Sequence, residues 1–323
     1  MLQRFFQKYT GWLRSLKAVY VINNFLNADR LRRNRDLYRK FGLRKSIFMP
    51  VGHRDFAEKP AAEKPWLDQP DALEKLRQHA DFQLFTKEIQ EALIHFVENG
   101  YLTLPGFFPP DEVEKLNGEV AKLRAEGRAN FNFTGRKIFN IHEFSLVSDQ
   151  VFFKNERLLR LLEFMFGRPP VPFQTLHFIE GSEQRPHSDS IHMTTEPPGF
   201  LLAAWTALEP VDEQNGTLVF YPKSHRLPFV STDDYDSGNT FLTVGNDSNR
   251  RYEDKIAQVL QENDLKPAFF HGQPGDVFIW HANLIHGGSP ILKPGSSRRS
   301  MVAHYFAEGV ICYHEMTQRP ALI

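Results

Sequence analysis

The chain has 323 residues, of which 41% are hydrophobic and 13% aromatic, and this composition excludes a disordered or fibrous protein. The formal net charge is zero, but residues 1–54 hold 13 Lys and Arg against two Asp, whereas the remainder holds 26 basic and 37 acidic side chains. Because an acidic domain repels phosphate, we expect no nucleic-acid partner.

The first part of the chain predicts a basic helical extension followed by a linker. Apolar residues three and four positions apart over residues 2–26 predict an amphipathic helix, and a second basic helix is expected at about 28–42. Residues 47–72 are rich in proline and charge, which is typical of a linker or an extended wrap. We therefore divide the chain into an extension (1–54), a linker or wrap (55–89) and a main domain (90–323).

The main domain begins with helices and continues with short apolar runs. The segment EIQEALIHFVEN predicts a helix ended by Gly100, YLTL a short strand, and PPDEVEKLNGEVAKLRAEG a helix opened by prolines and acids. A further helix is expected at about 151–166, ended by Gly167. After residue 170, short apolar runs separated by turn signals predict the strands of a sandwich or barrel.

One short motif in the strand-rich region carries metal-binding chemistry. Residues 187–189 read His-Ser-Asp after QTLHFI, so His187 and Asp189 would point to the same face of an extended segment. Two histidines and one carboxylate can hold Fe(II) on one face and leave positions open for oxygen and a co-substrate. The third ligand must come from downstream, where GDVFIWHANLIHGGSP (275–290) offers both His281 and His286.

These motifs resemble the phytanoyl-CoA dioxygenase family of Fe(II)- and 2-oxoglutarate-dependent oxygenases. The resemblance covers about residues 90–310 and includes HFVENGYLTLPGFFPPDEVEKL, the His-Ser-Asp motif, AAWTALEPVDEQNGTLVFYPKSHR, GDVFIWHANLIHGGSP and RRSMVAHYF. It implies a mostly β fold for residues 90–323, with flanking helices around a double-stranded β-helix (jelly-roll, cupin-like) core. It also implies that His286 completes the metal site with His187 and Asp189, whereas His281 is not a ligand.

The resemblance further implies residues that bind the co-substrate. Arg298 is expected to pair with the far carboxylate of 2-oxoglutarate, since a guanidinium binds a carboxylate through two hydrogen bonds and keeps its charge. Arg299 would face the opposite side of the strand. Lys137 and Trp205 are further expected contacts. Six further histidines are interpreted as core, surface or loop residues that bond locally: His142, His177, His192, His225, His271 and His304. For His192 a contact with the substrate is the alternative interpretation.

The implied activity is hydroxylation of an aliphatic C–H bond in a small or lipid-like molecule, with release of succinate and CO2. It requires Fe(II), 2-oxoglutarate and O2, with ascorbate as a reductant. Asp189 favours hydroxylation over halogenation, because related halogenating enzymes carry a small residue at that position. Two alternatives stay open: desaturation or cyclisation by the same class of enzyme, and a non-catalytic jelly-roll protein that binds a metal or ligand.

The compartment and the role of the extension are open at this stage. A single cysteine, Cys312, excludes an intrachain disulfide and favours a reducing, cytoplasmic location. No run reaches the roughly 20 apolar residues of a membrane-spanning helix. Residues 1–45 have three interpretations: peripheral contact with an anionic membrane, a mitochondrial targeting segment, or a helix pair packed on the domain or on a second subunit.

Overall fold

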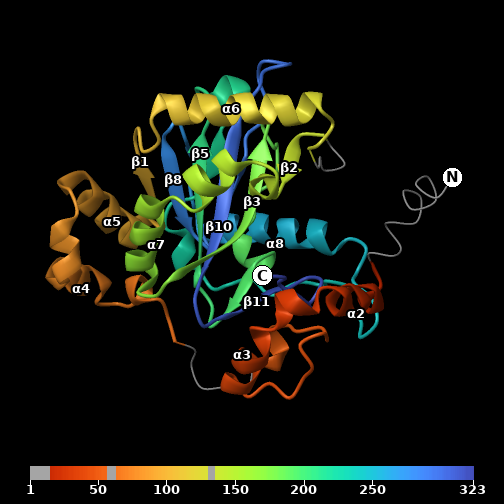
Figure 1. Cartoon of the computed structure of the whole chain (residues 1–323). Coiled ribbons are helices and arrows are strands. Elements are labelled where there is room, and N and C mark those ends of the chain that lie inside the picture. Colours follow the sequence, from red (N-terminus) through yellow and green to blue (C-terminus); the bar gives the residue numbers. More distant parts are fainter. Residues whose placement is uncertain (1–14, 57–62, 130–134) are drawn as a thin grey trace.

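Six antiparallel strands form the main sheet of the computed structural model, which describes residues 15–56, 63–129 and 135–323 (Figure 1). In spatial order the strands are β1 (Tyr101–Leu104), β8 (Val277–His281), β5 (Leu201–Ala207), β10 (Ser300–Ala307), β3 (Pro170–Phe178) and β2 (Lys137–Phe139). All neighbouring pairs are antiparallel.

Two smaller sheets complete the β core. One contains β7 (Ala268–Phe269), β6 (Leu218–Phe220) and β9 (His286–Gly288), and the other contains β12 (Arg319–Pro320), β11 (Ile311–His314) and β4 (Thr194–Glu196). The expected jelly-roll core with flanking helices is confirmed, although helices account for 39% of residues and strands for 19%. The apolar runs predicted as strands after residue 170 each contain a strand of these sheets: VPFQTLHFI, FLLAAWTAL, GTLVFY, AFFHG, DVFIWHA and SMVAHYF.

Helices cover the outer face of the main sheet and bury its apolar side chains. These helices are α5 (Lys87–Asn99), α6 (Pro110–Ala125) and α7 (Glu156–Phe166), and Figure 1 shows α6 lying across one end of the strands. Along β10, Met301, Ala303 and Tyr305 pack into the core shared with these helices. Because side chains alternate along a strand, the intervening residues face the other way, into the interior of the jelly roll.

The sequence signals for helix ends are confirmed. Helix α5 starts after Thr86, whose hydroxyl accepts a hydrogen bond from the Ile89 N–H, and ends at Gly100 with φ of 84°. Helix α7 ends at Gly167 with φ of 66°, but it begins only at Glu156, because the backbone of Asn155 is not helical and its side chain caps the helix by accepting the Leu158 N–H. The preceding residues Val147–Phe153 form a separate π-helical segment.

The extension differs from the expected pair of continuous helices. In its described part, α2 (Lys17–Leu26) begins after Leu16, which is extended and forms a β-bridge with Thr243. Residues 2–14 of the predicted first helix lie outside the described residues. The predicted second helix is divided into a 3-10 turn (Ala28–Leu31) and α3 (Asn34–Lys40). Among the described residues, no helix combines the length and the apolar character needed to cross a membrane.

Two further regions contain more helix than expected. The predicted linker includes α4 (Ala72–Gln78) and 3-10 turns at Trp66–Asp68 and Ala80–Leu84. Helix α8 (Ser248–Glu262) lies in the region after residue 170 where only strands were predicted, and it packs its buried Tyr252, Ile256 and Leu260 on the core. Other 3-10 turns are His53–Asp55, Ile141–Glu143, Asp189–Ile191, Glu213–Asn215 and Ser224–Arg226.

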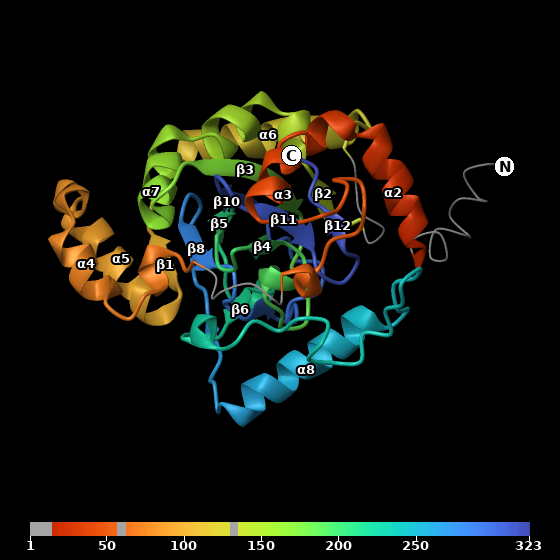
Figure 2. The same ribbon diagram turned by 90° about the horizontal axis from the view of Figure 1, so that it is seen from below.

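A hydrophobic cluster and a polar clasp join the extension to the domain. Apolar side chains between Leu31 and Phe56 pack on Ile311 and Tyr313 of β11. The clasp consists of His53, Asp233 and Glu315: Nδ1 of His53 lies 2.5 Å from Oε1 of Glu315, and Nε2 lies 2.6 Å from Oδ2 of Asp233. Figure 2 shows α2, α3 and α8 around the end of the molecule where β4, β11 and β12 lie.

Candidate metal centre

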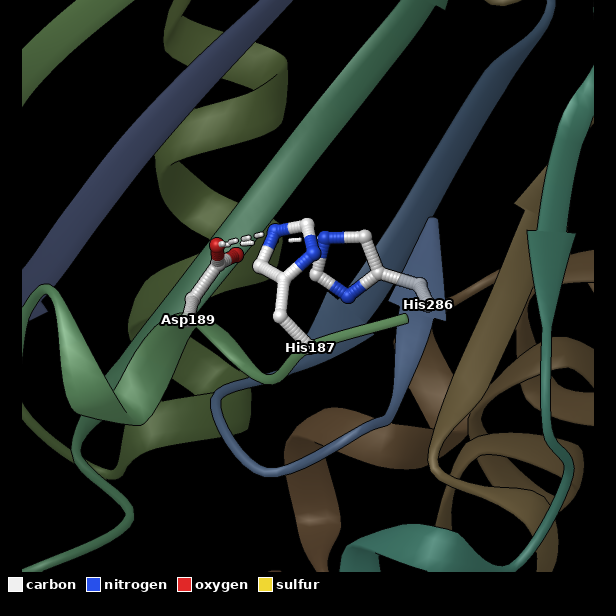
Figure 3. A group of neighbouring side chains, drawn as sticks. All are labelled: His187, Asp189 and His286. Carbon is white, nitrogen blue, oxygen red and sulfur yellow. Dashed lines mark ion pairs between the residues drawn. The ribbon is translucent and has the colours of Figure 1, made fainter. Parts of the chain in front are cut away.

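Three buried side chains converge at one point inside the jelly roll. His187, Asp189 and His286 each offer a ligand atom, and these atoms lie within 4.8 Å of one another. Oδ1 of Asp189 is 4.0 Å from Nε2 of His187 and 3.8 Å from Nε2 of His286. Figure 3 shows the carboxylate facing the two imidazole rings. Within the described residues, this is the one group of three or more such side chains that could hold a metal ion.

Backbone pairing brings the two histidines together although they are far apart in the sequence. The N–H of His187 donates to the carbonyl of His286, and the N–H of His286 donates to the carbonyl of His187, both at 2.9 Å. The two rings consequently lie side by side, with centroids 4.5 Å apart. Asp189 opens the 3-10 turn that follows His187, so its carboxylate returns toward the same point.

Hydrogen bonds at the ring nitrogens select the tautomer that a metal requires. Nδ1 of His187 lies 2.9 Å from the carbonyl of Arg185, and Nδ1 of His286 lies 2.9 Å from the carbonyl of Leu284. A carbonyl oxygen only accepts hydrogen bonds, so each Nδ1 carries the hydrogen and each Nε2 keeps its lone pair. Both lone pairs belong to the nitrogens that face Asp189.

Electrostatics also favours the deprotonated forms that bind a metal. Burial lowers the pKa of His187 to about 3, so its ring is neutral at neutral pH. Burial alone would raise the pKa of the Asp189 carboxyl, but the neighbouring rings of His286 and His304 outweigh it and hold this pKa below its ordinary range. Two imidazoles and one carboxylate in these forms fit a divalent iron ion.

A cavity of about 540 Å³ opens beside the three side chains. Arg298 lines it and is 3% exposed, with its guanidinium 5.4 Å from the ring of Trp205 and Nη1 donating to Oγ of Ser300 at 2.9 Å. Burial lowers the pKa of Arg298 to about 10, so the group is charged at neutral pH. Arg299 instead donates through Nε to Glu209 at 2.8 Å, and it does not line this cavity.

The other residues expected at the site also line this cavity. Lys137 of β2 places Nζ 5.5 Å from the ring of Phe178, and burial lowers its pKa. Trp205 of β5 is 2% exposed and lies beside Arg298. His281, the second downstream histidine, lies elsewhere, because its Nε2 is 3.0 Å from Oδ2 of Asp68.

Two histidines that were not assigned to the site also line the cavity. His304 lines the cavity together with Val302, which lies on the same face of β10, and its Nε2 is 3.6 Å from Oδ2 of Asp189. His192 also lines the cavity and lies beside His187, with ring centroids 5.9 Å apart. Strand parity was a signal in the sequence that could have identified His304.

The sequence contained no signal for two other parts of the site. Trp280 of β8 donates its indole N–H to Oδ2 of Asp189 at 2.8 Å. Tyr252 of α8 accepts a hydrogen bond from the N–H of Ser188 at 3.0 Å and so holds the turn between the ligands. The outer end of the cavity is lined by residues from the extension and the C-terminal segment: Asn23, Asn24, Arg30, His314, Arg319, Pro320, Ala321 and Leu322.

Comparison with known proteins places this geometry in a family. The profile described as phytanoyl-CoA dioxygenase (PhyH) matches residues 96–300. The phytanoyl-CoA dioxygenase domain-containing protein 1 of Danio rerio is 25% identical over an alignment of 183 residues. The match covers 40% of this chain and 63% of that protein, just under two thirds of its length. The peroxisomal phytanoyl-CoA dioxygenase of Mus musculus is 22% identical over 246 residues, covering 67% of this chain and 68% of the mouse protein.

Solved structures share the fold. The non-heme alpha ketoglutarate dependent epimerase SnoN from nogalamycin biosynthesis has a TM-score of 0.55 at 20% identity, covering 69% of this chain and 84% of SnoN. EctD from S. alaskensis, with 2-oxoglutarate and 5-hydroxyectoine, has a TM-score of 0.53 at 22% identity, covering 80% and 82%. The profile match spans more than half of the chain, and this chain therefore belongs to the phytanoyl-CoA dioxygenase family of Fe(II)- and 2-oxoglutarate-dependent oxygenases.

Proposed function

We propose that the protein is an Fe(II)- and 2-oxoglutarate-dependent hydroxylase of a small molecule. One observation carries this proposal: the ligand atoms of His187, Asp189 and His286 converge at the wall of a cavity that also contains the buried cation Arg298. A metal site with no cation nearby to bind the carboxylate of 2-oxoglutarate that does not chelate the iron would fit many other reactions. The combination is what 2-oxoglutarate, a dicarboxylate that chelates iron at one end, requires.

In this proposal the two histidines and Asp189 hold the metal on one face. Bound iron supplies the activation of O2 that an unactivated C–H bond requires. The Nδ1 hydrogen bonds of the histidines keep both Nε2 lone pairs aimed at the metal position. Because the ligands are buried and preoriented, little reorganisation is needed when the ion binds.

The opposite part of the cavity is proposed to bind the co-substrate. Arg298 pairs with the far carboxylate of 2-oxoglutarate, and Ser300 fixes the guanidinium from the other side. Lys137 adds a second cation to the same cavity. Trp205 supplies an apolar wall beside the guanidinium, which excludes water from the pair and strengthens it.

Hydroxylation, with 2-oxoglutarate converted to succinate and CO2, is the proposed reaction. Asp189 is retained, so the metal position that a halide would need is taken by a carboxylate. Among proteins of the same fold, SnoN is described as an epimerase and SnoK as a carbocyclase. Desaturation or cyclisation is therefore the alternative outcome at the same site, and product analysis by mass spectrometry separates it from hydroxylation by the gain of one oxygen atom.

The test is succinate release by the full chain with Fe(II), ascorbate, O2 and 2-oxoglutarate. We expect release that depends on iron and oxygen and that rises with a small-molecule extract containing the substrate. Omission of 2-oxoglutarate and addition of a chelator are the controls. Absence of both 2-oxoglutarate binding and succinate release would favour the non-catalytic metal-binding or ligand-binding protein.

We also propose that the substrate is lipid-like and that the extension contacts an anionic membrane. Helix α2 exposes Ile22, Phe25 and Leu26 while it buries Lys17 and Asn24, the reverse of an ordinary surface helix. Asn23 and Asn24 of the same helix line the cavity. The residues of the extension that follow α2 carry more Lys and Arg than Asp, and this positive charge attracts anionic lipids.

Vesicle co-sedimentation tests the membrane contact. A variant with serine at 22, 25 and 26 is expected to lose binding to vesicles containing phosphatidylserine, because it removes the exposed apolar side chains of α2. A variant with serine at Leu84 and Leu146, which are equally exposed elsewhere, is the matched control. Equal binding by both variants and the unchanged chain would contradict the proposal.

A further inference from the structure

The two oxygens of the Asp189 carboxylate lie in different surroundings. Oδ1 faces Nε2 of both His187 and His286, at 4.0 and 3.8 Å. Oδ2 accepts the indole N–H of Trp280 at 2.8 Å, and it also lies 3.6 Å from Nε2 of His304. One oxygen is therefore directed at the metal position, whereas the other is bonded to the protein.

Trp280 contacts two of the three ligands at once. Besides its hydrogen bond to Asp189, its ring lies against the ring of His286, with centroids 4.6 Å apart. The side chain is 2% exposed. Its backbone belongs to β8, which is paired with β1 on one side and β5 on the other, through Tyr101 and Ala203. The indole is thus fixed by sheet register rather than by a loop.

We propose that Trp280 is a positioning residue that makes Asp189 a single-oxygen ligand. A free carboxylate can bind a metal through one or both oxygens. By donating to Oδ2, the indole N–H withdraws that oxygen from the metal, so the coordination positions needed by co-substrate and O2 stay open. Nε2 of His304 is 3.6 Å from the same oxygen, whereas the indole nitrogen is 2.8 Å away, so Trp280 makes the closer contact with Oδ2. This inference rests on the proposed function, because it concerns the same metal site.

The experiment compares Trp280→Phe with a matched control, Trp66→Phe. Trp66 also donates its indole N–H, to the carbonyl of Phe164 at 2.9 Å, but it lies outside the metal cavity. We expect Trp280→Phe to bind Fe(II) about 10–100-fold more weakly in anaerobic equilibrium dialysis, the usual effect of losing a partner of a metal ligand. Trp66→Phe should bind as the unchanged chain does.

The Co(II)-substituted protein provides a spectroscopic readout that a purely structural role would not change. If Asp189 gains a second bond to the metal in Trp280→Phe, the coordination geometry changes and so does the visible Co(II) spectrum. Thermal unfolding of the metal-free variants checks that both fold. If Trp280→Phe does not fold, replacement of Trp280 by 3-benzothienylalanine removes only the N–H and retains the ring shape.

The outcomes are distinct. Unchanged Fe(II) affinity in Trp280→Phe overturns the inference, and weaker affinity with an unchanged Co(II) spectrum overturns the single-oxygen assignment. Weaker affinity in both Trp280→Phe and Trp66→Phe also overturns it, because the effect would then be one of general stability. If the unchanged chain binds neither Fe(II) nor 2-oxoglutarate, the proposed function itself fails.

Discussion

Two clusters of histidine and carboxylate in this molecule have the same residue types and different chemistry. In the metal centre, each histidine donates through Nδ1 to a backbone carbonyl and keeps Nε2 for another partner. In the clasp, both ring nitrogens of His53 lie against carboxylates, Glu315 at 2.5 Å and Asp233 at 2.6 Å. Because a carboxylate accepts hydrogen bonds, His53 carries hydrogen on both nitrogens and has no lone pair for a metal.

The pKa values follow the same division. The hydrogen bond to Glu315 raises the pKa of His53 to about 9, because its effect is larger than the opposing effect of burial. Burial lowers the pKa of His187 to about 3. One ring is a cation that attaches the extension to the domain, and the other is a neutral ligand. Residue type alone therefore does not distinguish a metal site from an ion-pair clasp; the partner of each ring nitrogen does.

The largest expected effect comes from breaking the metal centre. Asp189→Ala should reduce succinate release to background, because it removes the carboxylate ligand and its ion-binding charge. Asp233→Ala removes a carboxylate from the clasp and should retain Fe(II) binding. Iron content and succinate release of the two purified variants, with circular dichroism as a fold control, make the comparison. Retained turnover in Asp189→Ala would refute the ligand assignment.

A second test separates the two adjacent arginines. Arg298→Gln should weaken 2-oxoglutarate binding by about 2–4 kcal/mol, since it removes a buried charge from a carboxylate pair. Arg299→Gln should leave 2-oxoglutarate binding unchanged, because Arg299 pairs with Glu209 outside the cavity. Isothermal titration of the iron-loaded proteins with 2-oxoglutarate measures both. The reverse order of effects would assign the anchor to Arg299.

The clasp and the metal centre should respond to pH in opposite directions. The folded pKa of His53, about 9, lies above the ordinary histidine value of 6.5, so its stabilisation is fully present below pH 6.5 and is lost as the pH rises through about 9. The folded pKa of His187, about 3, lies below 6.5, so in the metal-free protein its stabilisation is lost as the pH falls from 6.5 toward 3.

His53→Ala tests the alkaline side of this prediction. We expect it to lower the free energy of unfolding by on the order of 2 kcal/mol at neutral pH, after allowance for solvent screening, and to remove the loss of stability toward pH 9. Urea unfolding across the pH range measures the slope. A slope identical to that of the unchanged chain would show that His53 is not the titrating group.

The smallest effect is expected at the exposed end of the clasp. Asp233→Asn should lower the free energy of unfolding by less than about 1 kcal/mol, because its side chain is 41% exposed and such pairs contribute little. Glu315→Gln, at a side chain that is 2% exposed, should cost more. Equal losses in the two variants would mean that burial does not distinguish the two carboxylates.

Several features of this protein follow from the sequence alone. Local patterns predicted the helix ends at Gly100 and Gly167 and the strand runs after residue 170, since a backbone preference or an apolar alternation is encoded within a few residues. Motif spacing and resemblance identified His187, Asp189, His286 and Arg298 as one site. Local order left His281 and His286 as equal candidates for the third ligand, and the family resemblance distinguished them.

Other features depended on tertiary structure. Helix α2 begins only after Leu16, which forms a bridge to Thr243, a contact that no local pattern reports. The hydrogen bond between Trp280 and Asp189 joins residues 91 positions apart, and it exists because the register of β8 against its neighbours places the indole beside the His-Ser-Asp turn. A local pattern determines which face a side chain occupies, but only the packing of distant strands determines which atoms meet there.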